Sequence, residues 1–335
     1  MKSEPIITVI MPVFNVEKYI KESVESVLNQ TVKDFEFLIY DDCCTDDTIK
    51  IIEEFKDDRI IIIRNTENIG LTKSLNKGIE IAKGKFIVRT DGDDICLPDR
   101  FERQLKQFER DSELGICGSW FLNFGDRNGV SVYPENHDDI QLGLLFQSQF
   151  CHVSVMIKKS VLDQFNLRYN ENFITAQDYE LWTRITHLTK SYNIPEVLMK
   201  CRFHSSSISV IKKEQQLKNR DQIILNQIRL IGFKKEIENI QLFIDFCNSK
   251  FDFKLQEIEW LKGFLSELII ENNESKFLKK NSFENFIKEK WFHLCYNMKF
   301  NNLNSYSYYR NSSLAKKLNF IDKLKFFLRS KYKRK

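Results

Sequence analysis

The sequence has few of the residues that interrupt helices and strands, and those few are unevenly distributed. Five prolines and eleven glycines occur in 335 residues. Every proline lies at or before Pro195, and nine of the glycines lie at or before Gly143. Turns are therefore concentrated in the first part of the chain, whereas the later part favours helix after helix. We expect an α/β domain over residues 1–210 and a helical region over residues 211–335.

Other absences exclude whole classes of protein. No run of about 18 apolar residues occurs, so no membrane-spanning helix is expected. The N-terminal segment contains Glu4 and Pro5 and only a short apolar run, which does not fit a signal peptide. The eight cysteines include no CxxC pair, so structural zinc is disfavoured, and we expect reduced thiols in the cytoplasm.

Two common nucleotide-binding signatures are also missing. There is no GxGxxG fingerprint of a dinucleotide-binding fold. The segment from Gly78 to Lys85 is one residue too long for a P-loop, and Phe86 stands where that loop requires Ser or Thr. A hydride-transferring enzyme or a P-loop NTPase is therefore disfavoured.

Negative charge is scarce at the C-terminal end. Residues 316–335 hold nine Lys/Arg and one acid, a balance of +8, which leaves −4 of the formal net charge of +4 for residues 1–315. This tail fits an amphipathic helix lying on an anionic membrane, and equally a solvated basic end of the helical region. Its apolar residues on one arc of a helical wheel are Phe320, Ile321, Leu324, Phe327 and Leu328.

Strand-like apolar runs alternate with helical periodicity in the first hundred residues, which is typical of a parallel sheet covered on both faces. Thr45 is placed to cap a further helix, with Asp46 and Asp47 in its first turn. The expected strands are Ile6–Met11, Phe35–Tyr40, Ile60–Ile63 and Lys85–Arg89, and the expected helices are Val16–Gln30 and Leu71–Ala82. Beyond them we expect strands at Ile116–Asn123, Ser131–Tyr133 and Val153–Ile157, an extended segment at Tyr192–Phe203, and helices at Pro98–Arg110 and Asp178–Leu188.

Two of the expected strands end in acidic residues. The pair at 41–42 closes the second strand, and Asp91-Gly92-Asp93-Asp94 closes the fourth. Ligands of parallel sheets bind at these strand ends, and adjacent carboxylates there are costly unless a cation lies between them. Mg²⁺ or Mn²⁺ bridging a diphosphate fits this pattern, and Gly92 would let the backbone approach the ligand. A solvated acidic turn is the alternative for a DxD pattern alone.

A series of short motifs runs through residues 5–209. In order they are ITVIMPVFN at 7–15, VLNQT at 27–31, DD at 41–42, TDDT at 45–48, NIGL at 68–71, NKGI at 76–79, AKGKFI at 82–87, RTDGDD at 89–94, PDRF at 98–101, CHVSVMIK at 151–158, QDYELW at 177–182 and CRFH at 201–204. As a set they resemble the bacterial family 2 glycosyltransferases, of the type that builds surface polysaccharides. The resemblance implies a GT-A nucleotide-sugar-binding fold with a mostly parallel sheet.

The resemblance also implies where the nucleotide-sugar binds. Pro12 and Phe14 match the loop that lines the nucleotide site after the first strand. Asp42 matches the carboxylate that reads the uracil ring, with Asp41 beside it. Asp91 matches the first acid of the DxD motif, near the ribose.

The metal and the base are assigned in the same way. Asp93 matches the acid that holds a divalent metal, Mn²⁺ or Mg²⁺, under the diphosphate, and His204 matches a histidine that closes over it in some members. Asp178 matches the catalytic base, although an N-cap of the helix that follows is a second, compatible reading. Leu75 replaces an arginine frequent in the family, so Lys73 or the metal would neutralise the diphosphate.

Several positions depart from the family pattern or have a plainer explanation. Cys43-Cys44 replaces the usual Gly-Ser after the first acidic pair, and Gln177 replaces the acid before the base. His152 is expected to be structural, with contact to the acceptor as the alternative, and Trp120 and Trp182 are expected to be core residues or an acceptor platform.

The expected function is therefore inverting transfer of a hexose from a UDP-sugar to a hydroxyl of a polyprenyl-diphosphate-linked saccharide, in synthesis of capsule, lipopolysaccharide or a similar polymer. The expected location is the cytoplasm, peripheral to the inner membrane. A metal-dependent sugar nucleotidyltransferase and a non-catalytic membrane-binding module are the alternatives. The first usually has a Gly/Arg/Lys-rich loop where Met11-Pro12-Val13-Phe14 stands here. A nucleic-acid partner is not expected, because residues 1–315 are net acidic.

Overall fold

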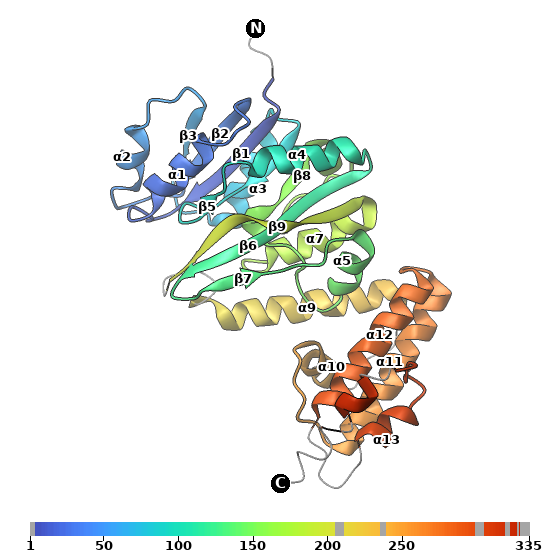
Figure 1. Cartoon of the computed structure of the whole chain (residues 1–335). Helices are drawn as coiled ribbons and strands as arrows, with labels where there is room; N and C mark the ends of the chain where they lie inside the picture. The colour runs from blue at the N-terminus through green and yellow to red at the C-terminus, as the bar shows by residue number, and fades with distance from the viewer. Residues whose placement is uncertain are drawn as a thin grey trace. The chain divides into compact units, whose positions relative to one another are not determined.

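The structure is a computed structural model that describes residues 4–204, 211–234, 239–298, 305–318, 322–326 and 328. Contacts divide the chain into two units (Figure 1). Unit 1 comprises residues 1–144 and 148–220, and unit 2 comprises residues 145–147 and 221–335. The boundary that the sequence predicts, between residues 210 and 211, precedes this division, which follows Arg220.

Unit 1 is built on one mixed sheet with the strand order β3-β2-β1-β4-β8-β6-β9-β5, and β7 pairs with β6. The first four strands of this order are mutually parallel, β8 is antiparallel to both β4 and β6, and β9 runs parallel to β6. The α/β fold with a mostly parallel sheet is thereby confirmed. The strands are β1 (Ile7–Val13), β2 (Phe35–Asp41), β3 (Ile60–Arg64), β4 (Phe86–Arg89), β5 (Ile95–Cys96), β6 (Leu114–Gly125), β7 (Gly129–Ser131), β8 (Met156–Lys158) and β9 (Lys190–Phe203).

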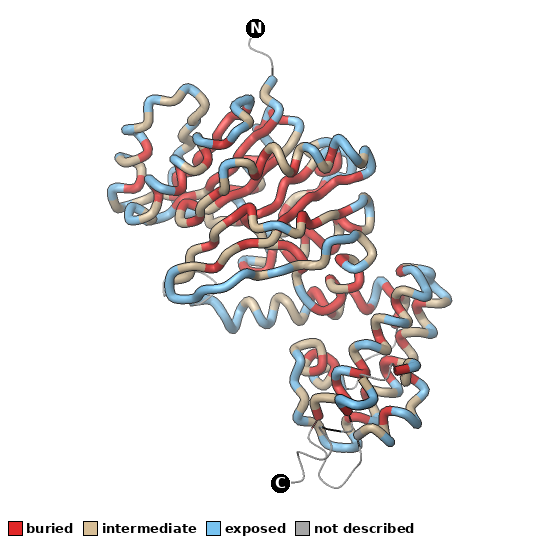
Figure 2. Tube along the Cα trace, in the orientation of Figure 1, coloured by how far each residue is buried: buried red, intermediate tan, exposed pale blue. Residues whose placement is uncertain are grey.

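Burial explains why the central strands read as continuous apolar runs. Every residue of β2 is buried, and so is every residue of β1 except the partly exposed Pro12, whereas the edge strand β3 is partly exposed along its length. Figure 2 shows the buried residues following these strands. A strand covered on both faces is mostly apolar because it has no solvated side, and its buried polar residues need partners, as Glu36 of β2 accepts from the Thr8 hydroxyl of β1 at 2.6 Å.

The helices of unit 1 cover this sheet, and α3 packs on β1. Helices α1 and α4 begin later than the sequence predicts, at Ile20 and Arg100 in place of Val16 and Pro98. Residues 16–19 form a turn in which the carbonyl of Val16 accepts from the N–H groups of Tyr19 and Ile20, so α1 starts at Ile20. The bounds are α1 (Ile20–Leu28), α2 (Thr48–Glu53), α3 (Leu71–Ile81), α4 (Arg100–Arg110), α5 (His137–Gly143), η1 (His152–Ser154), α6 (Lys159–Gln164) and α7 (Gln177–Leu188).

Three local predictions are wrong. Asp47, not Thr45, is the N-cap residue of α2, and the backbone N–H of Thr45 donates to Asn15 Oδ1 at 2.8 Å. The strand expected at 153–157 is interrupted by a 3₁₀ turn, in which the Ser154 N–H donates to the carbonyl of Cys151, and only β8 is extended. Strand β7 ends at Ser131, before residues 132–133 that were expected to belong to it.

Unit 2 is helical, as the sparse Gly and Pro content predicts. Helix α9 (Lys213–Ile231) begins in unit 1 and continues in unit 2, followed by α10 (Ile240–Cys247), α11 (Leu255–Ser275), α12 (Lys280–Asn297) and α13 (Ser305–Arg310). Residues 145–147 belong to this unit although the chain on either side of them belongs to unit 1. The ring of Phe146 meets those of Phe243, Phe246 and Phe286 at centroid distances of 6.0, 6.2 and 5.4 Å.

Of the basic tail, residues 319–321, 327 and 329–335 lie outside the described residues, so most of the predicted apolar arc is not described. Leu324 and Leu328 from that arc are exposed, whereas Phe326 is buried against Phe292, Tyr296 and Tyr309. Among the residues described, no helix combines the length and the hydropathy needed to span a lipid bilayer.

Candidate active site

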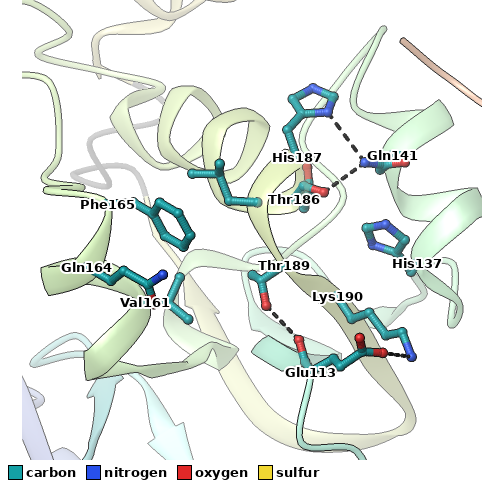
Figure 3. Close-up of a pocket in the computed structure, with 11 residues that line it drawn as sticks. Glu113, His137, Gln141, Val161, Gln164, Phe165, Thr186, His187, Thr189 and Lys190 are labelled. Carbon is teal, nitrogen blue, oxygen red and sulfur yellow. Dashed lines mark hydrogen bonds and ion pairs between the residues drawn. The ribbon is translucent and has the colours of Figure 1, made fainter. Parts of the chain in front are cut away.

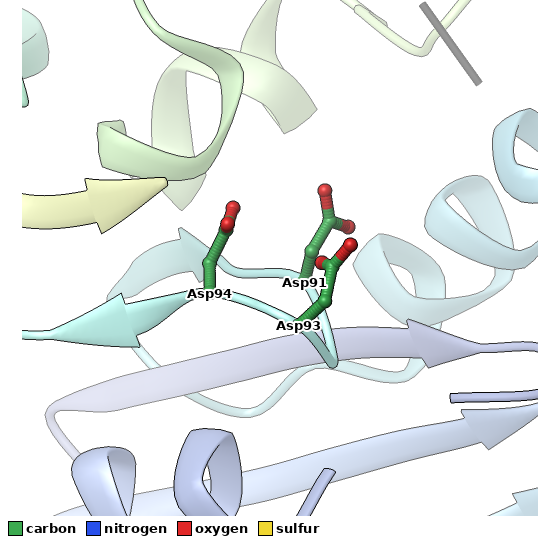
Figure 4. A group of neighbouring side chains, drawn as sticks. All are labelled: Asp91, Asp93 and Asp94. Carbon is green, nitrogen blue, oxygen red and sulfur yellow. The ribbon is translucent and has the colours of Figure 1, made fainter. Parts of the chain in front are cut away.

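Three carboxylates rise from one turn between β4 and β5 (Figure 4). Asp91, Asp93 and Asp94 each offer an oxygen, and these oxygens lie within 4.8 Å of one another. The turn follows the carboxyl end of β4, next to that of β1, where parallel sheets bind their ligands. A set of carboxylate oxygens with an imidazole nearby is a ligand type that suits Mg²⁺ or Mn²⁺. The residues present therefore fit the divalent metal that the sequence predicts.

Asp91 is paired with a buried arginine. The guanidinium Nη2 of Arg89, the last residue of β4, forms an ion pair with Asp91 Oδ1. The pKa of Asp91 is nevertheless raised to about 6, because burial and the charges of Asp93 and Asp178 together outweigh the lowering effect of Arg89. Without a metal, this site therefore resists full ionisation of its carboxylates.

Asp94 joins the turn to the far end of the sheet. Its Oδ1 accepts the backbone N–H of Arg202 at 2.8 Å, which ties the turn to the end of β9. The side chain is buried, and burial followed by the charges of Asp93 and Asp91 raises the pKa of Asp94 well above its usual range.

Asp93 and His204 are brought together as the sequence predicts for a metal site. His204 Nε2 lies 2.9 Å from Oδ2 of Asp93, although 111 residues separate the two in the chain. The imidazole nitrogen thus lies within hydrogen-bonding distance of one carboxylate of the acidic cluster.

The first acidic pair has a different environment. Asp42 Oδ1 accepts from the side-chain amide of Asn65 and the N–H of Ile69, and Oδ2 accepts from the N–H of Gly70. Asp41 Oδ1 accepts the N–H of Cys44 at 2.8 Å. A carboxylate offers about four lone-pair positions, so the three donors leave Asp42 one for a ligand.

The remaining predicted nucleotide residues lie around these two strand ends. Pro12 is partly buried in β1, and Phe14, just beyond it, is exposed. A Cβ at Gly92 would meet Val13 and Val16 side-chain atoms at 3.1 and 3.0 Å. In this structure, therefore, the Gly92 backbone closely approaches other protein side chains. Lys73 is exposed on α3, and among the described residues it makes no ion pair with the acidic cluster.

Asp178 is the second residue of α7, and the N-cap position is occupied by Ala176 in a left-handed conformation with φ 58° and ψ 18°. The N-cap reading of Asp178 is therefore wrong. Burial raises the pKa of Asp178, whereas backbone N–H groups and the charge of Arg89 lower it. The Asp178 charge also raises the pKa of Asp91, so the two carboxylates interact electrostatically.

Sequence reasoning assigned no role to Arg89 and Tyr169, which interact electrostatically with Asp178. The phenol of Tyr169 lies 3.0 Å from His152 Nε2, and its pKa is raised by burial and by the Asp178 and Asp91 charges. Burial and Arg89 both lower the pKa of His152, which keeps it neutral. One signal in the sequence pointed to Arg89. It stands at the end of an expected strand, two residues before Asp91.

Trp182 and Trp120, the two tryptophans singled out from the sequence, differ in burial. Trp182 is fully buried against the rings of His152 and Tyr169, so it cannot serve as an acceptor platform. Trp120 is partly exposed, and its indole N–H donates to the carbonyl of Tyr133 at 3.0 Å.

A separate pocket of about 500 Å³ lies at the opposite end of β9, around Lys190 (Figure 3). It contains none of the predicted site residues. Its polar lining is already paired in part, since Gln141 donates to the Thr186 carbonyl and Lys190 pairs with Glu113. The lining residues are Glu113, His137, Gln141, Val161, Gln164, Phe165, Thr186, His187, Leu188, Thr189 and Lys190.

The mixed sheet and the acidic turn after β4 agree with a GT-A fold, and so does comparison with solved structures. The crystal structure of Staphylococcus aureus TarS residues 1–349 in complex with UDP superposes with a TM-score of 0.56 at 16% identity, covering 85% of this chain and 87% of that one. This likeness concerns the fold alone.

Sequence comparisons identify the family. Residues 8–167 match the model described as glycosyl transferase family 2. The uncharacterized glycosyltransferase MJ1057 of Methanocaldococcus jannaschii is 38% identical over 224 residues, 63% of this chain and 76% of that protein. Escherichia coli WfaP, a UDP-Glc:alpha-D-GlcNAc-diphosphoundecaprenol beta-1,3-glucosyltransferase, is 28% identical over 242 residues, 71% of this chain and 91% of WfaP. The chain belongs to glycosyl transferase family 2.

Proposed function

We propose that this protein transfers a hexose, with inversion, from a UDP-sugar to a hydroxyl of a saccharide acceptor in surface polysaccharide synthesis. The observation that supports it most is the acidic cluster after β4, whose carboxylate oxygens lie within 4.8 Å of one another, together with the electrostatic effect of Asp178 on Asp91. Such a cluster can hold a cation and a diphosphate, and the Asp178 carboxylate can serve as the proton acceptor. The name of the relative WfaP gives UDP-Glc as its donor, which supports UDP as the nucleotide.

In this proposal Asp93 and His204, with Asp91 and Asp94 close by, hold a divalent metal, Mn²⁺ or Mg²⁺. When bound, the metal supplies positive charge that stabilises the departing UDP. The nucleotide itself would lie against the β1 and β2 ends, with Pro12 and Phe14 on one side and Asp41 and Asp42 on the other.

Asp178 acts as the base. It accepts the proton of the acceptor hydroxyl while that oxygen attacks the anomeric carbon and the bond to UDP breaks. A base must be ionised, and the nearby guanidinium of Arg89 favours the ionised form against the effect of burial. Because there is one displacement, an α-linked donor would give a β-linked product.

The acceptor is proposed to be linked to a polyprenyl diphosphate, as the diphosphoundecaprenol in the name of WfaP suggests. Such an acceptor resides in a membrane, so we propose peripheral binding at its cytoplasmic face through the basic tail. Deletion of residues 329–335 tests this, because it removes five Lys/Arg while keeping the buried Phe326. Co-sedimentation with anionic phosphatidylglycerol vesicles should fall, and unchanged co-sedimentation would contradict tail binding.

A screen of UDP-sugars with and without Mn²⁺ tests the reaction itself. UDP release should depend on one donor, on the metal and on the acceptor. Asp178→Asn should reduce transfer by about 10³-fold or more while UDP binding persists. Asp163→Asn is the matched control, since Asp163 is an exposed residue of α6 paired with Lys159. A nucleotidyltransferase would release pyrophosphate instead, and near-normal turnover by Asp178→Asn would refute the assignment of the base.

A further inference from the structure

Three segments far apart in the chain meet at the guanidinium of Arg202, near the end of β9. Its Nε donates to the main-chain carbonyl of Asp93 at 3.0 Å, and its Nη2 donates to Glu22 of α1 at 2.6 Å. Its central carbon lies 4.7 Å from the ring centroid of Tyr19 and 4.3 Å from that of Phe124 in β6. The side chain therefore joins α1, the acidic turn and β6.

The main chain around Arg202 reaches the same cluster. The Arg202 N–H donates to Asp94, and His204, two residues further on, lies 2.9 Å from Asp93. Tyr19 also faces His204, with ring centroids 5.2 Å apart. One strand end thus sets the positions of two carboxylates and one imidazole.

We propose that Arg202 is a positioning residue for the cation and diphosphate site, a role that rests on the proposed function. Its side chain does not contact the carboxylates of Asp91, Asp93 or Asp94, and a guanidinium cannot ligate a metal. It acts by fixing the backbone at Asp93 and the end of β9, so that Asp93 and His204 converge before the ligand arrives. Side chains that are already in position bind a cation and a diphosphate more tightly, because fewer protein groups must become ordered on binding.

The contacts require the shape of arginine as well as its charge. A planar guanidinium can donate in two directions within its plane while its faces lie on aromatic rings. A lysine ammonium is a point charge on a flexible stem and cannot make this set of contacts together. The ion pair with Glu22 contributes less, because 58% of the Glu22 side chain is exposed and such pairs are screened by solvent.

The test measures binding of UDP and Mn²⁺ directly, with transfer as a second readout. Calorimetry on the full chain gives the UDP dissociation constant in Mn²⁺, and electron paramagnetic resonance gives the fraction of Mn²⁺ bound. We expect Arg202→Lys and Arg202→Met each to weaken binding about tenfold or more, because a charged hydrogen bond and its ordering effect are lost. Arg103→Lys is the matched control. Arg103 lies on α4 and pairs with Glu196, which belongs to β9 as Arg202 does but lies outside the site.

The Mn²⁺ dependence of transfer separates positioning from general damage. High Mn²⁺ should restore most of the turnover of Arg202→Lys, because mass action offsets a weaker metal site. Thermal unfolding shows whether the variant is folded, and if Arg202→Met fails to fold, Arg202→Lys decides. Unchanged UDP and Mn²⁺ binding by Arg202→Lys, or lost turnover that Mn²⁺ does not restore, would overturn the inference. Wild-type protein that binds neither UDP nor Mn²⁺ would overturn the proposed function and the inference with it.

Discussion

The two acidic strand ends begin from the same pattern, adjacent aspartates after a buried strand, and are surrounded differently. After β2, the Asp42 carboxylate accepts three hydrogen bonds from the segment that leads into α3. After β4, three carboxylates lie within 4.8 Å of one another, and the pKa values of Asp91 and Asp94 are raised.

A carboxylate can stabilise the fold by accepting backbone hydrogen bonds, or it can bind a cation, and the two strand ends differ in this respect. Asp42 satisfies backbone N–H groups, so it stabilises the segment that leads into α3 whether or not a ligand is present. The cluster after β4 has more negative charge than its arginine can neutralise, which is unfavourable until a cation binds. We therefore expect substitutions at the first end to change stability and those at the second to change binding.

The largest expected effect is on metal binding at the second end. Asp93→Asn should weaken Mn²⁺-dependent UDP binding by about 100-fold, since even indirect supports of metal ligands contribute 10- to 100-fold. Without metal its melting temperature should equal or exceed that of the wild type, because one of three crowded charges is gone. Calorimetry and thermal unfolding measure the two quantities. A lower melting temperature with unchanged Mn²⁺-dependent UDP binding would show that Asp93 serves stability and not metal binding, which contradicts the expected difference between the two strand ends.

At the first end, Asp42→Asn should lower the free energy of unfolding by about 1.5–3 kcal/mol. An amide has one accepting oxygen, so its NH₂ group would face the N–H of either Ile69 or Gly70. Urea unfolding without ligand measures the change. Stability equal to that of the wild type would show that the three hydrogen bonds do not order this segment.

The pH dependence of stability should also distinguish the two ends. The pKa of Asp91 is raised to about 6 in the folded protein from 3.8, so the folded state binds more protons between these values. Stability should therefore fall as pH rises from about 4 to about 6, by about 1–2 kcal/mol for this residue. Asp91→Asn should flatten that part of the metal-free profile, and saturating Mn²⁺ and UDP should do likewise. Coincident profiles for wild type and Asp91→Asn would contradict the raised pKa.

A smaller effect is expected from the amide that supports Asp42. Asn65 donates to Asp42 at 3.0 Å and to Ser74 at 3.2 Å. Asn65→Ala should cost about 0.5–1.5 kcal/mol in urea unfolding and leave the affinity for Mn²⁺ unchanged. A change in metal affinity would show that the two strand ends are coupled.

The parallel half of the sheet was predictable from sequence because its signals are local. Strands β1, β2 and β4 are short apolar runs, and each falls within two residues of its predicted range. The pairing of β6 with β9 was not predictable, because it joins strands far apart in the chain through a register with bulges.

Within the site, the carboxylates followed from strand ends and family resemblance, but their surroundings did not. Arg202 was visible only as part of a motif, and its contacts with Tyr19, Asp93 and Phe124 arise from placing β9 beside the acidic turn. The left-handed Ala176 before Asp178 was equally hidden, because alanine gives no local signal for that conformation.

Residues 145–147 belong to the helical unit, and this affects the design of truncated fragments. Unit 2 is discontinuous in sequence, so no single cleavage point separates the two units cleanly. A fragment ending at Arg220 would keep Phe146 but lose the three phenylalanines it packs against, leaving a large apolar ring in water and a tendency to self-associate. A fragment starting at Asp221 would instead have a hole where that ring belongs.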